Sequence, residues 1–126
     1  VGARNIGYIA PYSYEISKKR CFLLEGDGFE LGADATFGEG RDSIVGCIHP
    51  QSILGAIDAI ISSATTPLDA IFISCTSLKC ATIIAIAEAQ YGIPVISSNS
   101  AIAWDMARLA RLAMLANEKG LLFQQN

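Results

Sequence analysis

The chain has 126 residues, of which 52% are hydrophobic and 17% are charged, and its formal net charge at pH 7 is −3. This length suits one globular domain with a substantial core, whereas every apolar run is shorter than the roughly 20 residues of a membrane span. The basic residues are scattered, apart from residues 18–20, which excludes an electrostatic surface for nucleic acid. We expect a cytoplasmic protein with no nucleic-acid or membrane partner, and the first residue, Val1, indicates that the sequence begins inside a longer protein or after processing.

The first part of the chain predicts two strands with a helix between them. An apolar run over residues 4–10 indicates a short buried strand, and residues 13–25 predict a helix with Ser13 as its N-cap. Apolar and polar residues alternate over residues 29–37, which is typical of a half-exposed edge strand. The glycine-rich segment 38–46 predicts an irregular loop of the kind that can border a pocket.

The rest of the chain predicts helices and strands in alternation. Apolar residues at helical spacing predict a helix over residues 49–63, and an almost uninterrupted apolar run over residues 69–74 is typical of a central parallel strand. Composition predicts a helix over residues 76–91. A short buried strand at residues 94–97 and a long helix at residues 101–116 complete the series.

This alternation of short strands with helices favours a parallel sheet with right-handed crossover connections. The predicted fold class is α/β, a flavodoxin-like three-layer unit with a four-stranded parallel sheet. We expect one such domain over residues 1–116, followed by a C-terminal tail at residues 117–126.

Four cysteines and one histidine are the candidates for metal or thiol chemistry. They show neither C-x-x-C spacing nor a zinc-type cluster, so the sequence predicts free thiols and no metal site. We expect Cys21, Cys47 and Cys80 to pack as small apolar residues, unless the loop before Cys47 folds back toward a pocket. His49 precedes Pro50 and is expected to begin a helix rather than to act as a general base.

Polar side chains follow the predicted strands at the edge where their carboxyl ends meet, and open parallel sheets bind ligands at this edge. Tyr12 follows the first strand, Cys75 follows the central strand, and Ser98 and Asn99 follow the last one. If the helix over residues 76–91 begins directly after it, Cys75 faces free backbone N–H groups and the positive end of the helix dipole. Both favour the thiolate over the thiol.

Two hydroxyl side chains, Thr76 and Ser77, lie beside the same N–H groups, so this segment is suited to a substrate carboxylate. The alternative is that Cys75 is a small buried apolar residue, since free cysteine is among the most buried residue types. Tyr12 is likewise either a donor to a bound anion or an ordinary packed tyrosine. Position alone leaves both alternatives open.

Several segments together resemble one known family. They are S-C-T-S-L at residues 74–78, G-I-P-V-I-S-S-N-S-A-I-A-W at residues 92–104, R-L-A at residues 108–110, and the opening I-G-Y-I-A-P-Y at residues 6–12. These segments resemble the aspartate/glutamate racemase superfamily over residues 5–110. Within it, the chain is most similar to the branch of maleate cis-trans isomerases, ectoine-utilisation proteins and arylmalonate decarboxylase.

The resemblance implies an enzyme built from two α/β halves, each contributing one catalytic cysteine to the cleft between them, and this chain matches the second half. Cys75 is then the catalytic thiol, which transfers a proton at a carbon next to a carboxylate without a metal or organic cofactor. The segment around Gly40 departs from the family because it lacks an asparagine often found there. The substrate-binding residues expected from the family motifs and the strand ends are Tyr12, Thr76, Ser77, Ser98 and Asn99.

The first hypothesis is a cofactor-independent isomerase or racemase of a small carboxylate or dicarboxylate, similar to maleate isomerase, that needs a second α/β half. The second is an arylmalonate-type decarboxylase, in which one thiol suffices to protonate the product. The third is a non-catalytic half that serves as a binding or assembly module. Members of such families commonly form homo-oligomers, and we expect the apolar helix at residues 101–116 to supply the contact.

Overall fold

Four parallel strands form one sheet in the computed structural model, which describes residues 1–112 and 120–124. The predicted four-stranded parallel sheet is therefore confirmed, with the alternating segment at its edge and the long apolar run inside it. In sheet order the strands are β2 (Glu30–Thr36), β1 (Asn5–Ala10), β3 (Ala70–Ile73) and β4 (Val95–Ser97).

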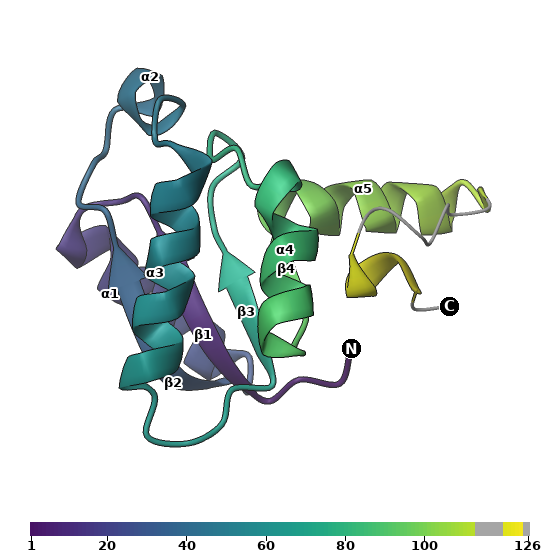
Figure 1. Cartoon of the computed structure of the whole chain (residues 1–126), viewed down its shortest axis with the longest axis horizontal. Helices are drawn as coiled ribbons and strands as arrows, with labels where there is room; N and C mark the ends of the chain where they lie inside the picture. The colour runs from purple at the N-terminus through teal and green to yellow at the C-terminus, as the bar shows by residue number, and fades with distance from the viewer. Residues whose placement is uncertain (113–119, 125–126) are drawn as a thin grey trace.

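Helices cover both faces of this sheet. In Figure 1, α3 and α4 lie in front of the strands and α1 lies behind them, while α5 extends away from the body of the molecule. No helix within the described ranges is long and apolar enough to cross a membrane. The helices are α1 (Tyr14–Gly26), α2 (Asp42–Val45), α3 (Pro50–Ser63), α4 (Ala81–Tyr91) and α5 (Ser98–Leu109), with a 3₁₀ turn, η1 (Leu121–Gln124).

The helix expected from residue 76 begins only at Ala81, and this prediction was wrong by five residues. Residues 76–80 instead form a turn in which the Leu78 N–H donates to the Cys75 carbonyl at 3.3 Å. Serine and threonine are weak helix formers because their hydroxyls compete for backbone hydrogen bonds. Leu78 is fully buried, so packing rather than helical hydrogen bonding holds this segment.

The last helix begins earlier than expected, at Ser98 rather than at residue 101. Ser97 is its N-cap, and the side chains and backbone amides of Ser97 and Ser100 bond reciprocally in a capping box. The serine-rich sequence before residue 101 is therefore the start of the helix. The helix ends at Leu109, and the remaining expected residues from 113 onward lie outside the described part.

The structure confirms some of the predictions for the loop, the helix caps and the C-terminal residues and contradicts others. The irregular segment 38–46 contains the single turn of α2. Ser13 stands at the N-cap position of α1, but its side chain makes no capping hydrogen bond. His49 begins α3 as predicted, since its Nδ1 accepts from the Gln51 N–H at 3.2 Å. Part of the expected tail is ordered, because η1 buries Leu122.

The core is unequal on the two faces of the sheet. A large cluster fills the space beneath α3 and α4, with Ile9, Ile73 and Val95 pointing into it from the strands. The face beneath α1 carries a much smaller cluster around Tyr8 and Cys21. Because successive side chains of a strand point to opposite faces, Phe72 and Ile96 lie on the α1 face, where both stay only half-buried.

Cys80 belongs to the large cluster, as predicted, and burial raises the pKa of its thiol to about 11. The same thiol in the unfolded chain loses its proton near pH 9. Between these values the unfolded state binds fewer protons than the folded state, so the free energy of unfolding falls as the pH rises, by about 2–3 kcal/mol in total.

The test is urea unfolding of the wild type and of Cys80→Ala across this alkaline window. We expect the variant to lose free energy of unfolding less steeply with pH than the wild type. Equal slopes in the two proteins would contradict a protonated, buried Cys80 thiol.

Candidate active site

A pocket of about 620 Å³ opens at the carboxyl ends of the strands, on the α1 face of the sheet. The parallel register brings these ends together, since Ile9 of β1 pairs with Ile73 of β3, which pairs with Ser97 of β4. Five of the six site residues expected from the sequence line this one pocket. They are Tyr12, Cys75, Thr76, Ser77 and Ser98.

Cys75 is held in an unusual backbone conformation directly after β3. Its φ angle is +98°, in the region that favours glycine, and its side chain is half-buried in the wall of the pocket. The Cys75 N–H donates to the Ser98 hydroxyl at 3.1 Å, and the preceding Ser74 N–H donates to the Ile9 carbonyl at 2.8 Å. Such strain costs about 1–3 kcal/mol and persists only where surrounding contacts enforce it.

The helix expected to begin directly after Cys75 begins five residues later, at Ala81, so this prediction was wrong. The helix end that meets the pocket belongs to α5, whose first residue is Ser98. Within the described ranges, the N–H groups of Thr76 and Ser77, two residues that line the pocket, have no hydrogen-bond acceptor.

Tyr12 forms another wall of the pocket. Its backbone is fixed by a hydrogen bond from the Thr36 hydroxyl to the Tyr12 carbonyl, and the Arg20 guanidinium lies 5.9 Å from the centre of its ring. Burial raises the pKa of the Tyr12 hydroxyl, and the Cys75 thiol raises it further, while the Ser74 hydroxyl and Arg20 lower it. The phenol is therefore protonated at neutral pH and can donate a hydrogen bond into the pocket.

Asn99 is the expected site residue that does not line this pocket. Its side-chain amide donates to the Thr76 carbonyl at 2.9 Å and lies along a neighbouring groove beside α4. Asn99 thus ties α5 to the turn that follows Cys75. Ser77 does line the pocket, and its hydroxyl donates to Asp42 Oδ1 at 3.5 Å.

Five further polar residues of the pocket were not among the expected site residues: Tyr8, Arg20, Asp27, Asp42 and Ser74. The hydroxyl of Tyr8 is buried and has no hydrogen-bond partner among the described residues. Period-two alternation places the Tyr8 ring on one face of β1, but it does not show where the polar tip ends. Arg20 belongs to the basic triplet at residues 18–20, for which no site role was predicted, and Asp42 lies in the loop expected to border a pocket.

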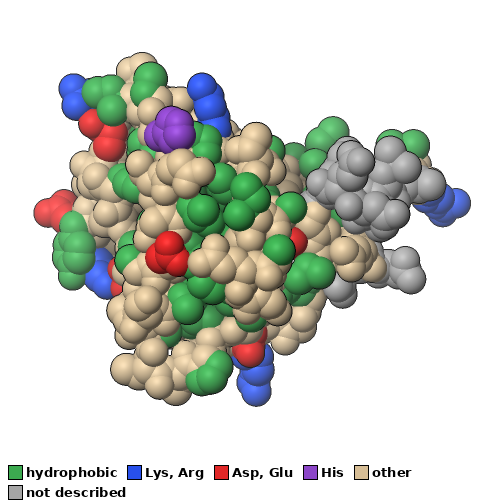
Figure 2. Space-filling model, viewed as in Figure 1, with side chains coloured by type: hydrophobic (Ala, Val, Ile, Leu, Met, Phe, Trp, Pro, Cys, Tyr) green, Lys and Arg blue, Asp and Glu red, His purple; other side chains and the backbone are tan. Residues whose placement is uncertain are grey.

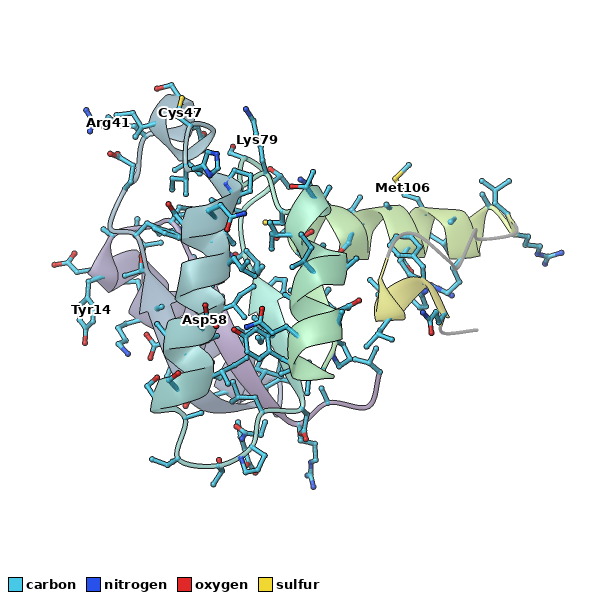
Figure 3. All side chains as sticks on the ribbon, viewed as in Figure 1. Tyr14, Arg41, Cys47, Asp58, Lys79 and Met106 are labelled. Atoms are coloured by element: carbon cyan, nitrogen blue, oxygen red, sulfur yellow. The ribbon has the colours of Figure 1, made fainter. Side chains whose placement is uncertain are left out.

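Cys47 stays outside this pocket. It is exposed beside the short helix α2, where its Sγ donates to the Ser43 carbonyl at 3.3 Å (Figure 3). The predicted packing of Cys47 as a small apolar residue was therefore wrong, whereas Cys21 and Cys80 are buried as expected. No group of three or more histidine, cysteine, aspartate or glutamate side chains in residues 1–112 and 120–124 is placed to hold a metal ion.

The strained backbone predicts an unusual order of stability at position 75. Glycine normally lowers stability relative to alanine, but it adopts a positive φ without the steric cost that alanine retains. We expect Cys75→Gly to be more stable than Cys75→Ala by about 1 kcal/mol, measured by urea denaturation. An alanine variant at least as stable as the glycine variant would show that position 75 carries no strain.

Comparisons with known proteins cover nearly the whole chain. A model of the arylmalonate decarboxylase family (Amdase) matches residues 1–123. A maleate isomerase of Nocardia farcinica is 26% identical over 125 residues, which are 98% of this chain and 49% of that protein. The solved maleate isomerase Iso of Pseudomonas putida S16 is 25% identical, with a TM-score of 0.86, over 98% of this chain and 49% of its own.

A solved arylmalonate decarboxylase has a TM-score of 0.86 at 22% identity, over 99% of this chain and 55% of its own, and it shows the likeness of fold alone. The chain spans about half the length of the relatives that it matches. Since the family model matches almost every residue, including the strand ends that form the pocket, the chain belongs to the arylmalonate decarboxylase family.

Proposed function

We propose that this chain is the thiol-bearing half of a cofactor-independent isomerase of a small carboxylate or dicarboxylate, with Cys75 as the group that transfers the proton. The observation that carries the proposal is the strained, half-buried Cys75 at the strand ends, in one pocket with the hydroxyls of Tyr12, Thr76 and Ser98. Backbone strain of this kind concentrates at functional sites.

The pocket offers the donors that such a reaction needs. As a proton leaves or joins the carbon next to a carboxylate, negative charge develops on the carboxylate oxygens as an enediolate. The free N–H groups of Thr76 and Ser77 and the Tyr12 hydroxyl can donate to that charge. The Cys75 S–H bond then gives its proton to the carbon, the electron pair of the enediolate forms the new C–H bond, and a thiolate remains to be reprotonated.

Relatives support the class of substrate. The maleate cis-trans isomerase of Nocardia farcinica has been solved with a covalently bound succinylcysteine intermediate, and the maleate isomerase Iso has been solved with maleate. We carry the class of substrate to this chain as part of the proposal, together with a second α/β half to complete the cleft, a cytoplasmic location and self-association.

Decarboxylation of an arylmalonate is the second candidate, because the family model that matches residues 1–123 is named for that reaction. In that case Cys75 protonates the enediolate left by the loss of CO₂, and a single thiol completes the reaction. The apolar side chains of Leu23, Leu24 and Phe72 in the pocket wall would suit an aryl group.

The test combines turnover with protection of the thiol. Proton NMR in D₂O follows maleate and an arylmalonate with the wild-type protein, and mass spectrometry measures alkylation of Cys75 with and without each compound. We expect one compound to be converted and to slow alkylation of Cys75 relative to Cys47. Alkylation of Cys75 that neither compound slows, with no turnover of either, would refute both candidates.

A further inference from the structure

The hydroxyl of Tyr8 is buried without a hydrogen-bond partner in the described part of the chain. Tyr8 lies in β1 with its side chain on the α1 face, lines the Cys75 pocket, and is only 1% exposed. Buried polar groups are nearly always hydrogen-bonded, because an unpaired donor that has lost its water destabilises the folded state. A pocket donor that stays unpaired in the free protein is therefore suited to a bound ligand.

Two other hydrogen-bond donors of the same pocket act on Tyr8. Burial raises the pKa of the Tyr8 hydroxyl, whereas the Ser74 hydroxyl and the Arg20 guanidinium lower it. Ser74 is itself only 8% exposed, and Arg20 reaches over the pocket from α1, with its guanidinium 5.9 Å from the centre of the Tyr12 ring. Three donors from β1, α1 and the end of β3 thus share one pocket.

Arg20 is the only cation among the described residues that line this pocket, and it forms no ion pair within them. The carboxylates of Asp27 and Asp42 also line the pocket, but both residues are exposed to water and salt, which screen their charge. Asp27 follows the end of α1, about two helical turns beyond Arg20, and Asp42 lies beside Ser77. The guanidinium is therefore free to meet an anion from solution.

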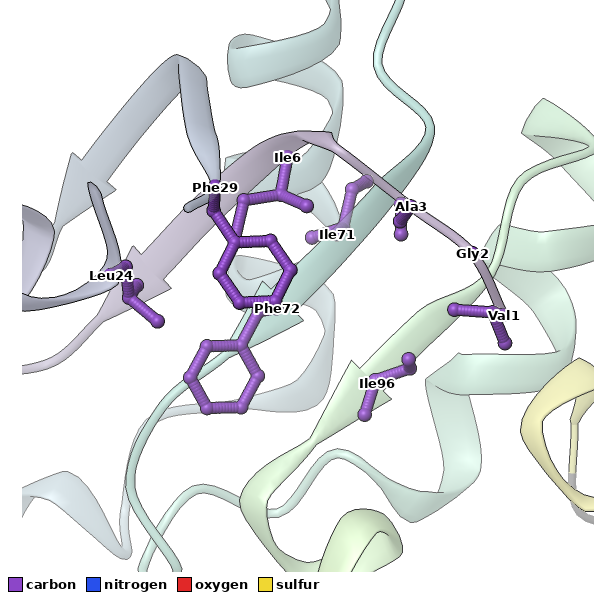
Figure 4. Close-up of a pocket in the computed structure, with 10 residues that line it drawn as sticks. Val1, Gly2, Ala3, Ile6, Leu24, Phe29, Ile71, Phe72 and Ile96 are labelled. Atoms are coloured by element: carbon purple, nitrogen blue, oxygen red, sulfur yellow. The ribbon is translucent and has the colours of Figure 1, made fainter. Parts of the chain in front are cut away.

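Beyond these donors the surface becomes apolar. Leu24 and Phe72 line both the Cys75 pocket and an adjacent groove, which no charged side chain of the described residues lines (Figure 4). Both hollows lie on the α1 face, which points away from the viewer in Figure 2. The groove offers no charge to a carboxylate, so an anionic group of a ligand belongs on the side of Tyr8 and Arg20.

We propose that Tyr8, Ser74 and Arg20 form a second subsite of the Cys75 pocket, which binds a carboxylate of the substrate that is remote from the reacting carbon. The inference rests on the proposed function and narrows the substrate to a short dicarboxylate with its carboxylates on different carbons. All three side chains donate hydrogen bonds, a carboxylate supplies only acceptors, and a guanidinium can pair with it in bidentate geometry. The other carboxylate then lies at the two unpaired N–H groups that follow the thiol.

This subsite distinguishes the two candidate reactions. An arylmalonate carries both carboxylates on one carbon, so an aryl ring rather than an acceptor would face Tyr8 and leave its hydroxyl unpaired. A dicarboxylate with separated carboxylates satisfies the hydroxyl. A site built from buried donors rejects analogues that lack the matching acceptor, because those donors then stay unpaired.

Binding of unreactive acids tests the subsite without turnover. NMR titration with succinate and with butyrate gives dissociation constants for two four-carbon acids that differ in the second carboxylate, and glutarate and pentanoate repeat the comparison with five carbons. We expect the wild type to bind the dicarboxylate at least about tenfold more tightly in one of the pairs. Tyr8→Phe and Arg20→Gln should each remove most of this preference and leave the affinity for the monocarboxylate unchanged.

The matched controls lie on α1, outside the pocket. Tyr14→Phe removes a phenol hydroxyl from a residue that is 66% exposed, and Lys19→Gln removes a positive charge beside Arg20. Both should keep the wild-type preference. Urea denaturation adds a second readout: Tyr8→Phe should be at least as stable as the wild type, because it removes a buried, unpaired hydroxyl and keeps the ring.

Equal affinity of the wild type for both acids of each pair would overturn the proposal, and so would a Tyr8→Phe variant that keeps the full preference. A Tyr8→Phe variant with a clearly lower urea midpoint would show that the hydroxyl has a partner within the fold, which also overturns it. Selective binding of a dicarboxylate without any turnover would refute the proposed function but leave the subsite standing. Turnover that depends on Cys75, without a preference for dicarboxylates, would refute the subsite alone.

Discussion

Replacing Cys75 by alanine is expected to lower kcat by about 10²–10⁴-fold with the substrate that the wild type converts, because a positioned proton donor contributes a factor of this size. The KM should change little, since the hydroxyl and N–H donors of the pocket remain. Steady-state kinetics on the wild type and on Cys75→Ala, prepared side by side, measure both constants.

The matched control is Cys47→Ala, which removes an exposed thiol that lies outside the pocket and whose Sγ donates only to a backbone carbonyl. This variant should keep wild-type kcat and KM. A Cys75→Ala variant with unchanged kcat would refute the catalytic role of the thiol. A variant with raised KM and unchanged kcat would instead assign Cys75 to substrate binding.

The alternation of strands and helices along the chain and the shared edge of the strands could be predicted because they follow from local patterns. Uninterrupted apolar runs indicate buried strands, and alternation indicates an edge strand, so the sequence predicts that Tyr12, Cys75 and Ser98 meet at one edge. The apolar residues of the strands that lead to this edge are buried as expected, for example Ile9 and Ile73.

The conformation of the thiol could not be predicted, because it depends on contacts between distant segments. The positive φ of Cys75 goes with a hydrogen bond to Ser98, 23 residues further along the chain. Composition placed a helix directly after Cys75, whereas the burial of Leu78 holds a turn there. Helix propensity over a few residues is weak, and tertiary packing readily overrides it.

Glu88 is a buried charged residue that holds β4, the strand at one edge of the sheet. It is buried in α4, whose other residues carry no charge, and there its Oε1 accepts from the Val95 N–H at 2.9 Å and its Oε2 accepts from the Leu121 N–H at 2.8 Å. One carboxylate thereby fastens both the start of β4 and η1 to α4. A lone glutamate among apolar helix residues was a sequence signal for such a role, although its two partners are 7 and 33 residues away.

Glu88→Ala is expected to lower the free energy of unfolding by about 2–4 kcal/mol, since it leaves two backbone N–H groups without an acceptor, one of them buried. The free energy of unfolding of Glu88→Gln should lie between those of the wild type and Glu88→Ala, because the glutamine amide oxygen can accept from one N–H while its NH₂ faces the other donor. Urea denaturation measures the three proteins, with Asp58→Ala on the exposed side of α3 as the control for removing a carboxylate.

An alanine variant as stable as Asp58→Ala would show that the buried carboxylate is not what fastens β4. The substitution should also disturb the pocket, because β4 leads directly into Ser98, whose hydroxyl accepts a hydrogen bond from the Cys75 N–H. Glu88→Ala should therefore lower kcat even under conditions where it stays folded, whereas Asp58→Ala should not. Glu88 does not line the pocket. It would then control the position of the Cys75 thiol through β4, the strand that it holds.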